Sequence, residues 1–167
     1  AELMEVVGKL RREIPDICLR TTLISGFPGE TEEEHEELLA FVEEMAFDRL
    51  GVFSYSQEED TPAALMPNQI PEEIKEERRG QLMELQQEVA FDAALSMRGK
   101  LVDAVIEGKV AEEDAYVART YKDAPNVDGF LFINTGRELM TGDFVKCRIT
   151  GAYEYDLIGE LEDEFTQ

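Results

Sequence analysis

The spacing of apolar residues changes at Gly99, and this change is the strongest constraint on how the chain folds. Before Gly99, long segments with helical spacing alternate with short apolar runs, which is typical of an α/β fold. After Gly99, short segments with alternating apolar residues are separated by turn residues, which indicates strands. The sequence therefore predicts an α/β part followed by an all-β part.

The first part is predicted to contain a strand–helix–strand unit. A helix over residues 2–13 precedes a strand over 17–25, and a second helix begins at Thr31. Glu34 follows Thr31 by three positions, the spacing of a capping box that satisfies free N–H groups at a helix start. A second strand is predicted over 49–55. Two successive strands joined through a helix must run parallel, with a right-handed crossover.

A polar loop over residues 56–70 and a long helix follow this unit. Pro71 suits the first helical turn, and the helix is predicted to run to about Arg98. Its expected apolar stripe consists of Ile74, Leu82, Leu85, Val89 and Ala93.

Five short strands are predicted at 100–106, 115–121, 129–134, 144–150 and 157–161. Their number and spacing predict a small five-stranded antiparallel β-barrel of the OB-like kind. The expected domains are residues 1–70, a connecting helix over 71–98, and a barrel over 99–167.

The chain is strongly acidic, with 38 Asp and Glu against 16 Lys and Arg and a formal net charge of −22. Residues 1–98 contribute −14 of this charge and residues 99–167 contribute −8. Such a surface repels nucleic acid at long range and attracts basic proteins. Many cytosolic proteins are acidic only for solubility, so charge alone leaves both explanations open.

Composition narrows the class of protein. An apolar content of 43% predicts a packed core rather than disorder. No apolar run approaches the roughly 18 residues of a membrane span, and no secretory signal opens the chain, so a cytoplasmic location is expected. Cys18 and Cys147 are expected to be buried thiols, the alternatives being a disulfide or a metal pair. A start at Ala1, inside a predicted helix, predicts a piece of a longer protein.

A run of glutamates around His35, over residues 32–37, raises the question of a metal site. Consecutive residues on a helix diverge around its axis, so their side chains cannot converge on one ion. No metal site is predicted, and His35 is expected to be partly buried on the apolar side of its helix.

The most specific segment runs from Arg20 to Thr31, where a predicted strand enters the loop Gly26-Phe27-Pro28-Gly29-Glu30. It is neither a Walker loop nor a dinucleotide fingerprint. Its two glycines would let the backbone approach a flat adenine closely, and the proline stiffens the turn. Strand alternation places Arg20, Thr22 and Ile24 on one face. The alternative is an ordinary strand-to-helix turn.

This segment resembles the late SAM-binding strand and loop of radical-SAM enzymes, written GFPGET in that family. The resemblance implies the C-terminal part of a (β/α) barrel, with the loop at its C-terminal rim. It further implies that Arg20 meets a carboxylate or ribose hydroxyl, that Ile24 packs on the adenine, and that Glu30 braces the loop. The implied cofactor-binding residues are Arg20, Thr22, Ile24, Gly26, Phe27, Pro28, Gly29, Glu30, Tyr55 and Ser56.

Tyr55 and Ser56 belong to a second segment, Phe53-Ser54-Tyr55-Ser56 with Glu59-Asp60-Thr61-Pro62-Ala63, which resembles the F-x-Y-S…E-x-G-T-x-A pattern of the family. The pair either flanks the cofactor or serves packing. Asp60 stands where the family usually has Gly, which leaves the conformation of this loop open.

The last part resembles a TRAM module, the small β-barrel that follows the radical-SAM barrel in methylthiotransferases. Residues 121–129 and 142–160 look like the branch that methylthiolates an aspartate of small-subunit ribosomal protein S-twelve. In such an enzyme one [4Fe–4S] cluster, held by a C-x-x-x-C-x-x-C triplet, cleaves SAM to a radical that takes hydrogen from the aspartate β-carbon. A second [4Fe–4S] cluster serves sulfur delivery, and another SAM supplies the methyl group.

Two distant cysteines cannot hold two clusters that each need three thiolates. This chain is therefore expected to lack catalytic and metal-binding residues and to be inactive alone.

The expected partner is the basic ribosomal protein, docked on the acidic barrel. The residues expected to dock it are Asp123, Asp128, Glu154, Asp156 and Glu160. Binding of nucleic acid is not expected, since a barrel that grips RNA should be basic. The alternatives are part of a tRNA methylthiotransferase, with an RNA-binding barrel, and a non-catalytic docking module for a basic protein. An open sheet edge also predicts self-association.

Overall fold

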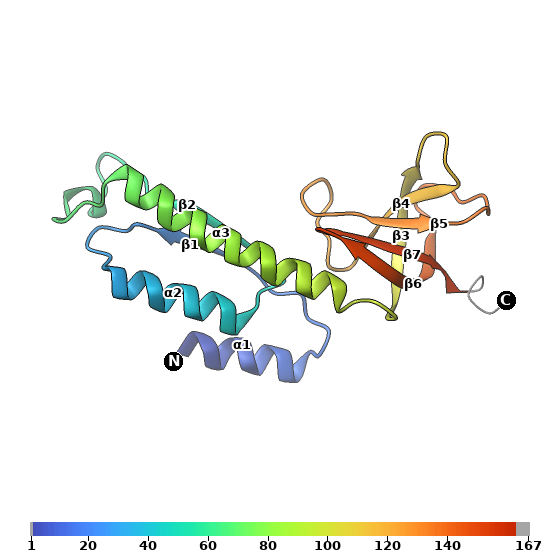
Figure 1. Ribbon diagram of the computed structural model, residues 1–167, viewed down its shortest axis with the longest axis horizontal. Coiled ribbons are helices and arrows are strands. Elements are labelled where there is room, and N and C mark those ends of the chain that lie inside the picture. The colour runs from blue at the N-terminus through green and yellow to red at the C-terminus, as the bar shows by residue number, and fades with distance from the viewer. Residues whose placement is uncertain (1, 163–167) are drawn as a thin grey trace. The chain divides into compact units, whose positions relative to one another are not determined.

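The computed structural model describes residues 2–162, and it consists of two compact units that divide between Ala90 and Phe91 (Figure 1). Residues 1 and 163–167 of the predicted domains lie outside the described range. The three-part division of the chain at residues 70 and 98 stays a prediction.

The first unit contains a parallel strand pair and three helices. Its elements are α1 (Glu2–Glu13), β1 (Arg20–Ser25), α2 (Glu32–Met45), β2 (Arg49–Ser54), the 3-10 turn η1 (Ala63–Leu65) and α3 (Glu72–Leu95). β1 and β2 pair in parallel from Arg20 opposite Arg49 to Ser25 opposite Ser54, which confirms the predicted strand–helix–strand unit. β1 begins three residues later than predicted.

The start of α2 confirms the predicted capping box. The backbone N–H of Glu34 donates to Thr31 Oγ1 at 3.2 Å, and the N–H of Thr31 donates to Glu34 Oε2 at 2.9 Å. Because these bonds join residues three positions apart, local sequence is enough to specify where this helix begins.

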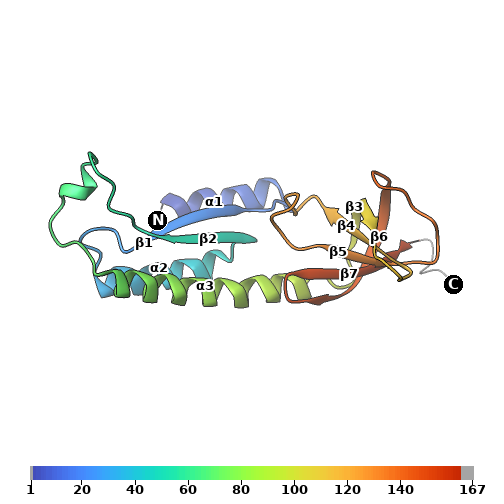
Figure 2. The same ribbon diagram turned by 90° about the horizontal axis from the view of Figure 1, so that it is seen from above.

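The two faces of the β1–β2 sheet differ in what covers them. Val42 of α2, Val52 of β2 and Leu82 of α3 form a buried cluster, and Figure 2 shows both helices along this side of the sheet. On the other face, Ile24 and Phe53 are partners in the strand register and are 58% and 63% exposed. We call the surface formed by Thr22, Ile24 and Phe53 the open face.

The buried stripe of α3 differs from the predicted one at its start. It comprises Lys75, Arg78, Leu82, Gln86 and Ala90. Ile74, predicted in the stripe, is 39% exposed. The prediction was wrong here because Lys75 and Arg78 bind groups in the neighbouring loops. The side of α3 that carries these two cations is therefore buried.

The second unit is a closed five-stranded barrel, as predicted. Its strands are β3 (Leu101–Lys109), β4 (Ala115–Thr120), β5 (Leu131–Asn134), β6 (Phe144–Tyr153) and β7 (Asp156–Leu161). They are ordered β3-β4-β5-β7-β6, and the interior includes the fully buried residues Ala118, Leu131, Ile133, Cys147 and Ile149.

One strand pair corrects the prediction of a wholly antiparallel barrel. β5 and β7 run parallel, from Leu131 opposite Leu157 to Asn134 opposite Glu160. A closed ring with an odd number of strands cannot alternate in direction throughout, so one pair must be parallel. Within the described residues, no helix is both long and apolar enough to cross a membrane.

Candidate functional site

The Gly26–Glu30 loop has a defined backbone shape that depends on its two glycines. Gly26 and Gly29 have φ angles of 76° and 87°, a region that residues with a Cβ rarely adopt. The N–H of Glu30 donates to the Phe27 carbonyl at 2.9 Å, and the N–H of Gly29 donates to the carbonyl of Asn68 at 2.9 Å. The loop is thus held both within itself and to the segment before α3.

Glu30 braces the loop through both carboxylate oxygens, in line with the role expected of it. Oε2 accepts a hydrogen bond from the Gly26 N–H at 3.0 Å, and Oε1 accepts one from Arg78 Nη1 at 2.7 Å. Arg78 also donates to the Glu30 carbonyl at 3.2 Å and to Glu32 Oε2 at 3.0 Å. Burial lowers the pKa of Arg78, but hydrogen bonds to Glu32 and Glu30 outweigh it and leave that pKa raised. The guanidinium therefore stays charged although the Arg78 side chain is buried.

Lys75 of α3 supports the same loop. Its Nζ donates to the Tyr55 carbonyl at 2.9 Å and pairs with Glu72 Oε2 at 2.8 Å. Its aliphatic stem lies against Gly26, where any Cβ would overlap Lys75 Cγ. The absence of a side chain at Gly26 is therefore a packing requirement as well as a backbone one.

Tyr55 lies beside the loop and is buried. Its N–H donates to the Ser25 carbonyl at 2.8 Å, which extends the sheet pairing by one residue. Its ring makes an edge contact with Phe27, with centroids 5.3 Å apart. Ser25 Oγ and Tyr55 Oη are buried and find no hydrogen-bond partner among the described residues. Two unsatisfied polar atoms thus sit where the two strands end.

The remaining residues predicted to bind the cofactor include Ser56, Arg20 and Thr22. Ser56 is exposed and donates to Glu58 at 2.7 Å. Arg20 begins β1, five positions before Ser25, so it stands roughly 16 Å away along the strand. Thr22 and Ile24 share its face of the strand. The loop, Ile24 and Tyr55 thus lie at the carboxyl ends of the two strands, Ser56 directly follows Tyr55, and Arg20 lies at the other end of β1.

Asp60 has a φ of 63°, in the left-handed region that glycine favours. Asp is among the few residues with a Cβ that visit this region. The departure from the family pattern therefore keeps the backbone shape that the usual glycine would allow.

Lys75 and Arg78 are the site residues that sequence reasoning missed. Both are only 6% exposed. A signal was present, because the two fall on the same helical row as Leu82, Gln86 and Ala90. A stripe that starts with cations indicates buried partners elsewhere in the chain.

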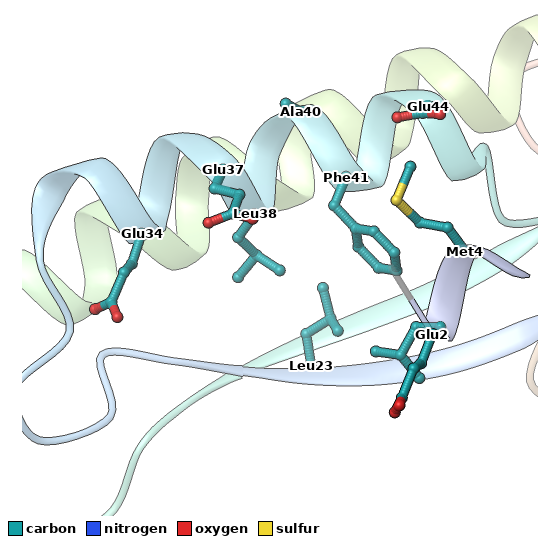
Figure 3. Close-up of a pocket in the computed structure, with 10 residues that line it drawn as sticks. Glu2, Met4, Leu23, Glu34, Glu37, Leu38, Ala40, Phe41 and Glu44 are labelled. Atoms are coloured by element: carbon teal, nitrogen blue, oxygen red, sulfur yellow. The ribbon is translucent and has the colours of Figure 1, made fainter.

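A separate groove of about 680 Å³ lies between α1 and α2, with Leu23 of β1 at its floor (Figure 3). Its apolar lining includes Met4, Leu38 and Phe41. Its polar lining consists of glutamates, namely Glu2, Glu34, Glu37 and Glu44. None of the predicted cofactor-binding residues lines it.

In the barrel, three of the five predicted docking carboxylates accept hydrogen bonds from the backbone, two of them within turns and one from a distant segment. Asp123 accepts from the Thr120 N–H at 2.9 Å and from its hydroxyl at 2.7 Å. Asp128 accepts from the Ala124 N–H at 2.6 Å, and Asp156 accepts from the Phe130 N–H at 2.7 Å. Glu154 is exposed in the β6–β7 turn, and Glu160 is half-buried on β7.

The bond between Phe130 and Asp156 brings the segment before β5 beside the β6–β7 turn. Exposed apolar side chains on these two segments include Val127, Tyr153 and Tyr155. We call residues 121–130 and 153–156 the barrel rim. Acidic and aromatic groups are interleaved on it.

The cysteines and His35 occupy separate, non-converging positions. Cys18 is half-buried in the first unit and Cys147 is buried in the barrel, and neither forms a disulfide in the part of the chain that the structure describes. His35 is buried, and its Nε2 lies 2.7 Å from Gln81 Oε1. Within residues 2–162, no three His, Cys, Asp or Glu side chains are placed to hold a metal ion.

Known proteins resemble this chain along nearly its whole length. Residues 99–161 match the family described as the TRAM domain. The chain is 56% identical to ribosomal protein uS12 methylthiotransferase RimO of Lachnoclostridium phytofermentans, over 96% of this chain and 37% of that protein. Identity to the protein of the same name from Desulfitobacterium hafniense is 49%, over 93% of this chain and 35% of that one.

The chain thus spans little more than a third of the length of these relatives. A solved structure, the apo form of Mycoplasma genitalium RNase R, aligns with 56% of this chain and 20% of its own at a TM-score of 0.31 and 9% identity, too low to inform fold or function. Identity of this degree along nearly the whole chain, with a TRAM match at residues 99–161, makes the chain similar to a part of the ribosomal protein uS12 methylthiotransferases.

Proposed function

We propose that this chain acts within a radical-SAM methylthiotransferase that modifies an aspartate β-carbon of ribosomal protein uS12. The observation that carries the proposal is the 56% identity to a protein of that name over 96% of the chain. The modification of a ribosomal protein also favours a cytoplasmic location.

In this proposal the Gly26–Glu30 loop and the open face form one wall of the SAM site. Gly29, where a Cβ would meet nothing within 4 Å, lets the backbone approach an adenine, and Ile24 offers an exposed apolar surface. These features fit the flat apolar face of an adenine base. SAM, when bound, supplies the methyl group and the reactive species, and this chain positions it and excludes water.

The residues present do not fit an iron–sulfur cluster. The chain has two cysteines, one in each unit, and a cluster needs several convergent thiolates. We therefore propose that the chain alone has no methylthiotransferase activity. Reconstitution with iron and sulfide should leave it without a cluster chromophore, and a stable chromophore would contradict this.

We further propose that the barrel docks the basic substrate protein. Residues 99–167 carry a charge of −8, which would repel RNA and steer a basic protein. The aromatic side chains on the barrel rim can also accept lysine or arginine side chains by cation–π contact.

One observation favours the second candidate, an RNA-binding barrel. Exposed aromatic residues such as Phe144 and Tyr153 are the kind of groups on which unpaired bases stack. A basic protein partner requires an acidic barrel, whereas RNA requires a basic one. Binding measured at two salt concentrations and in a charge-reversal variant therefore separates the two candidates.

The test is to titrate the full chain with purified uS12 and, separately, with a tRNA stem-loop, each at two salt concentrations. Glu154→Lys changes an exposed charge on the barrel rim. Glu5→Lys makes the same change on α1 and serves as the charge-matched control. We expect salt-sensitive binding to uS12 that Glu154→Lys weakens more than Glu5→Lys does. Tight binding to the stem-loop, strengthened by Glu154→Lys, would favour the RNA-binding barrel instead.

A further inference from the structure

Two cations on α3 are buried in a protein whose charge is overwhelmingly negative. Lys75 and Arg78 are each 6% exposed, whereas the neighbouring Arg79 is half-exposed and pairs with Glu76 one turn away. Burying a cation costs free energy unless it is paired and hydrogen-bonded. A buried cation adds little to solubility, so the burial of Lys75 and Arg78 must be explained by the contacts that they make.

The contacts of Arg78 that the structure shows lead to the end of the Gly26–Glu30 loop and to the start of α2. It donates to the Glu30 carboxylate at 2.7 Å, to the Glu30 carbonyl at 3.2 Å and to the Glu32 carboxylate at 3.0 Å. The second oxygen of Glu30 holds the N–H of Gly26 at 3.0 Å. One carboxylate thus links the first residue of the loop to α3 through a charge-assisted bond.

Lys75 holds the other side of the same loop. Its stem fills the space beside Gly26, and its Nζ binds the Tyr55 carbonyl at 2.9 Å. Gly26 is therefore fixed from two directions, by the Lys75 stem and by the Glu30 carboxylate that Arg78 orients. Without Arg78, Glu30 would lose its buried partner and its orientation, and the Gly26 N–H would lose a fixed acceptor.

We propose that Arg78 is a positioning residue for SAM binding, which acts through Glu30 to hold the Gly26–Glu30 loop in its binding conformation. This inference rests on the proposed function, in which that loop contacts SAM. Arg78 is not itself a catalytic residue, because the structure places its guanidinium against Glu30 and Glu32 rather than on the open face.

The experiment uses the full chain labelled with ¹⁵N. Amide hydrogen exchange of Gly26 and Glu30 reports loop order, and the shifts of loop amides during titration with SAM report affinity. The variants are Arg78→Ala, Arg78→Lys and the matched control Arg79→Ala. Guanidinium chloride at low millimolar concentration is added to each, because a free guanidinium ion can refill the place of a deleted arginine side chain.

We expect Arg78→Ala to weaken SAM binding and to speed exchange of the Gly26 amide by about tenfold each, the size of one lost charge-assisted hydrogen bond. Arg78→Lys should be intermediate, because an ammonium lacks the planar fork that reaches Glu30 and Glu32 together. Guanidinium ion should partly restore both readouts in Arg78→Ala. Arg79→Ala should change neither.

Unchanged exchange and unchanged SAM affinity in Arg78→Ala would overturn the proposal, and so would a loss that guanidinium ion does not restore. If Arg78→Ala fails to fold, Glu30→Gln replaces it, because the amide keeps the size of the side chain and removes the charge. Glu30→Gln should then weaken SAM binding, and unaltered affinity would overturn the proposal. If SAM shifts no loop amide in the unmodified chain, the proposed SAM wall fails, while hydrogen exchange still tests whether Arg78 orders the loop.

Discussion

The stem of Lys75 occupies the space into which any side chain at Gly26 would have to project. Gly26 also has a φ of 76°, so both its backbone conformation and its surroundings require glycine. Gly29, three residues later, has a φ of 87° but nothing within 4 Å of a Cβ built on it. The two glycines of one loop therefore carry different constraints.

We predict that Gly26→Ala destabilises the first unit by more than Gly29→Ala does. Gly29→Ala should cost about 1 kcal/mol from backbone strain alone. Gly26→Ala adds an overlap with Lys75 that forces a shift, for a total of about 2–4 kcal/mol. Urea denaturation of both variants measures the difference. Equal losses would mean that Lys75 moves aside without cost.

Asp60 should tolerate glycine and resist a β-branched residue. Its φ of 63° suits Gly or Asp, so Asp60→Gly should change the free energy of unfolding by less than about 0.5 kcal/mol. Asp60→Val should cost roughly 1–2 kcal/mol, the penalty for a bulky residue in the left-handed region. Urea denaturation compares the two. A large loss in Asp60→Gly would show that the carboxylate, and not the backbone shape, is what the loop needs.

Cys147 should make the barrel less stable at alkaline pH. Burial, aided by the Glu160 carboxylate, raises the pKa of the Cys147 thiol to about 12 from an ordinary value of 9.0. Below pH 9 the thiol is protonated in both the folded and the unfolded state, so its contribution to stability is constant. As pH rises from 9 toward 12, the unfolded state releases a proton that the folded state retains, and stability falls.

The measurement is the urea midpoint of the barrel transition between pH 8 and pH 10.5, for the unmodified chain and for Cys147→Ala. The variant is less stable throughout but should show a shallower decline with pH. Iodoacetamide at pH 8 should alkylate the half-buried Cys18 well before Cys147. Rapid modification of Cys147 in the folded chain would contradict the raised pKa.

The open face should drive association between copies of the chain. β1 and β2 form a two-stranded sheet among the described residues, with Ile24 and Phe53 exposed side by side. Apolar surface next to unpaired strand edges favours pairing with a second copy. Sedimentation velocity at rising concentration should show larger species, and Phe53→Ser should reduce them. Leu65→Ser, which removes an exposed leucine from η1, is the control. A chain that stays monomeric at high concentration would refute this.

Local patterns predicted most elements because their causes lie within a few residues. Thr31 and Glu34 cap α2 through bonds to each other, and the glycines mark a loop in which φ must be positive. The parallel pairing of β1 and β2 follows from the intervening helix. For the barrel, the alternation of apolar residues showed where the strands lie but not which strands pair with each other. The number of strands requires one parallel pair, and only the observed order identifies it as β5–β7.

Sequence alone therefore established the order of helices and strands, the start of α2, the glycine loop at residues 26–30 and the acidic charge, because each depends on neighbouring residues or on composition. Tertiary structure decided which side of α3 is buried. Helical spacing favoured Ile74, but Lys75 and Arg78 turn inward because their partners, the Tyr55 carbonyl and the Glu30 carboxylate, lie 20 and 48 residues away. It also decided the role of Asp156, which accepts a hydrogen bond from the Phe130 N–H, 26 residues away. A buried charge is placed by its partner, and local sequence does not show where a distant partner will lie.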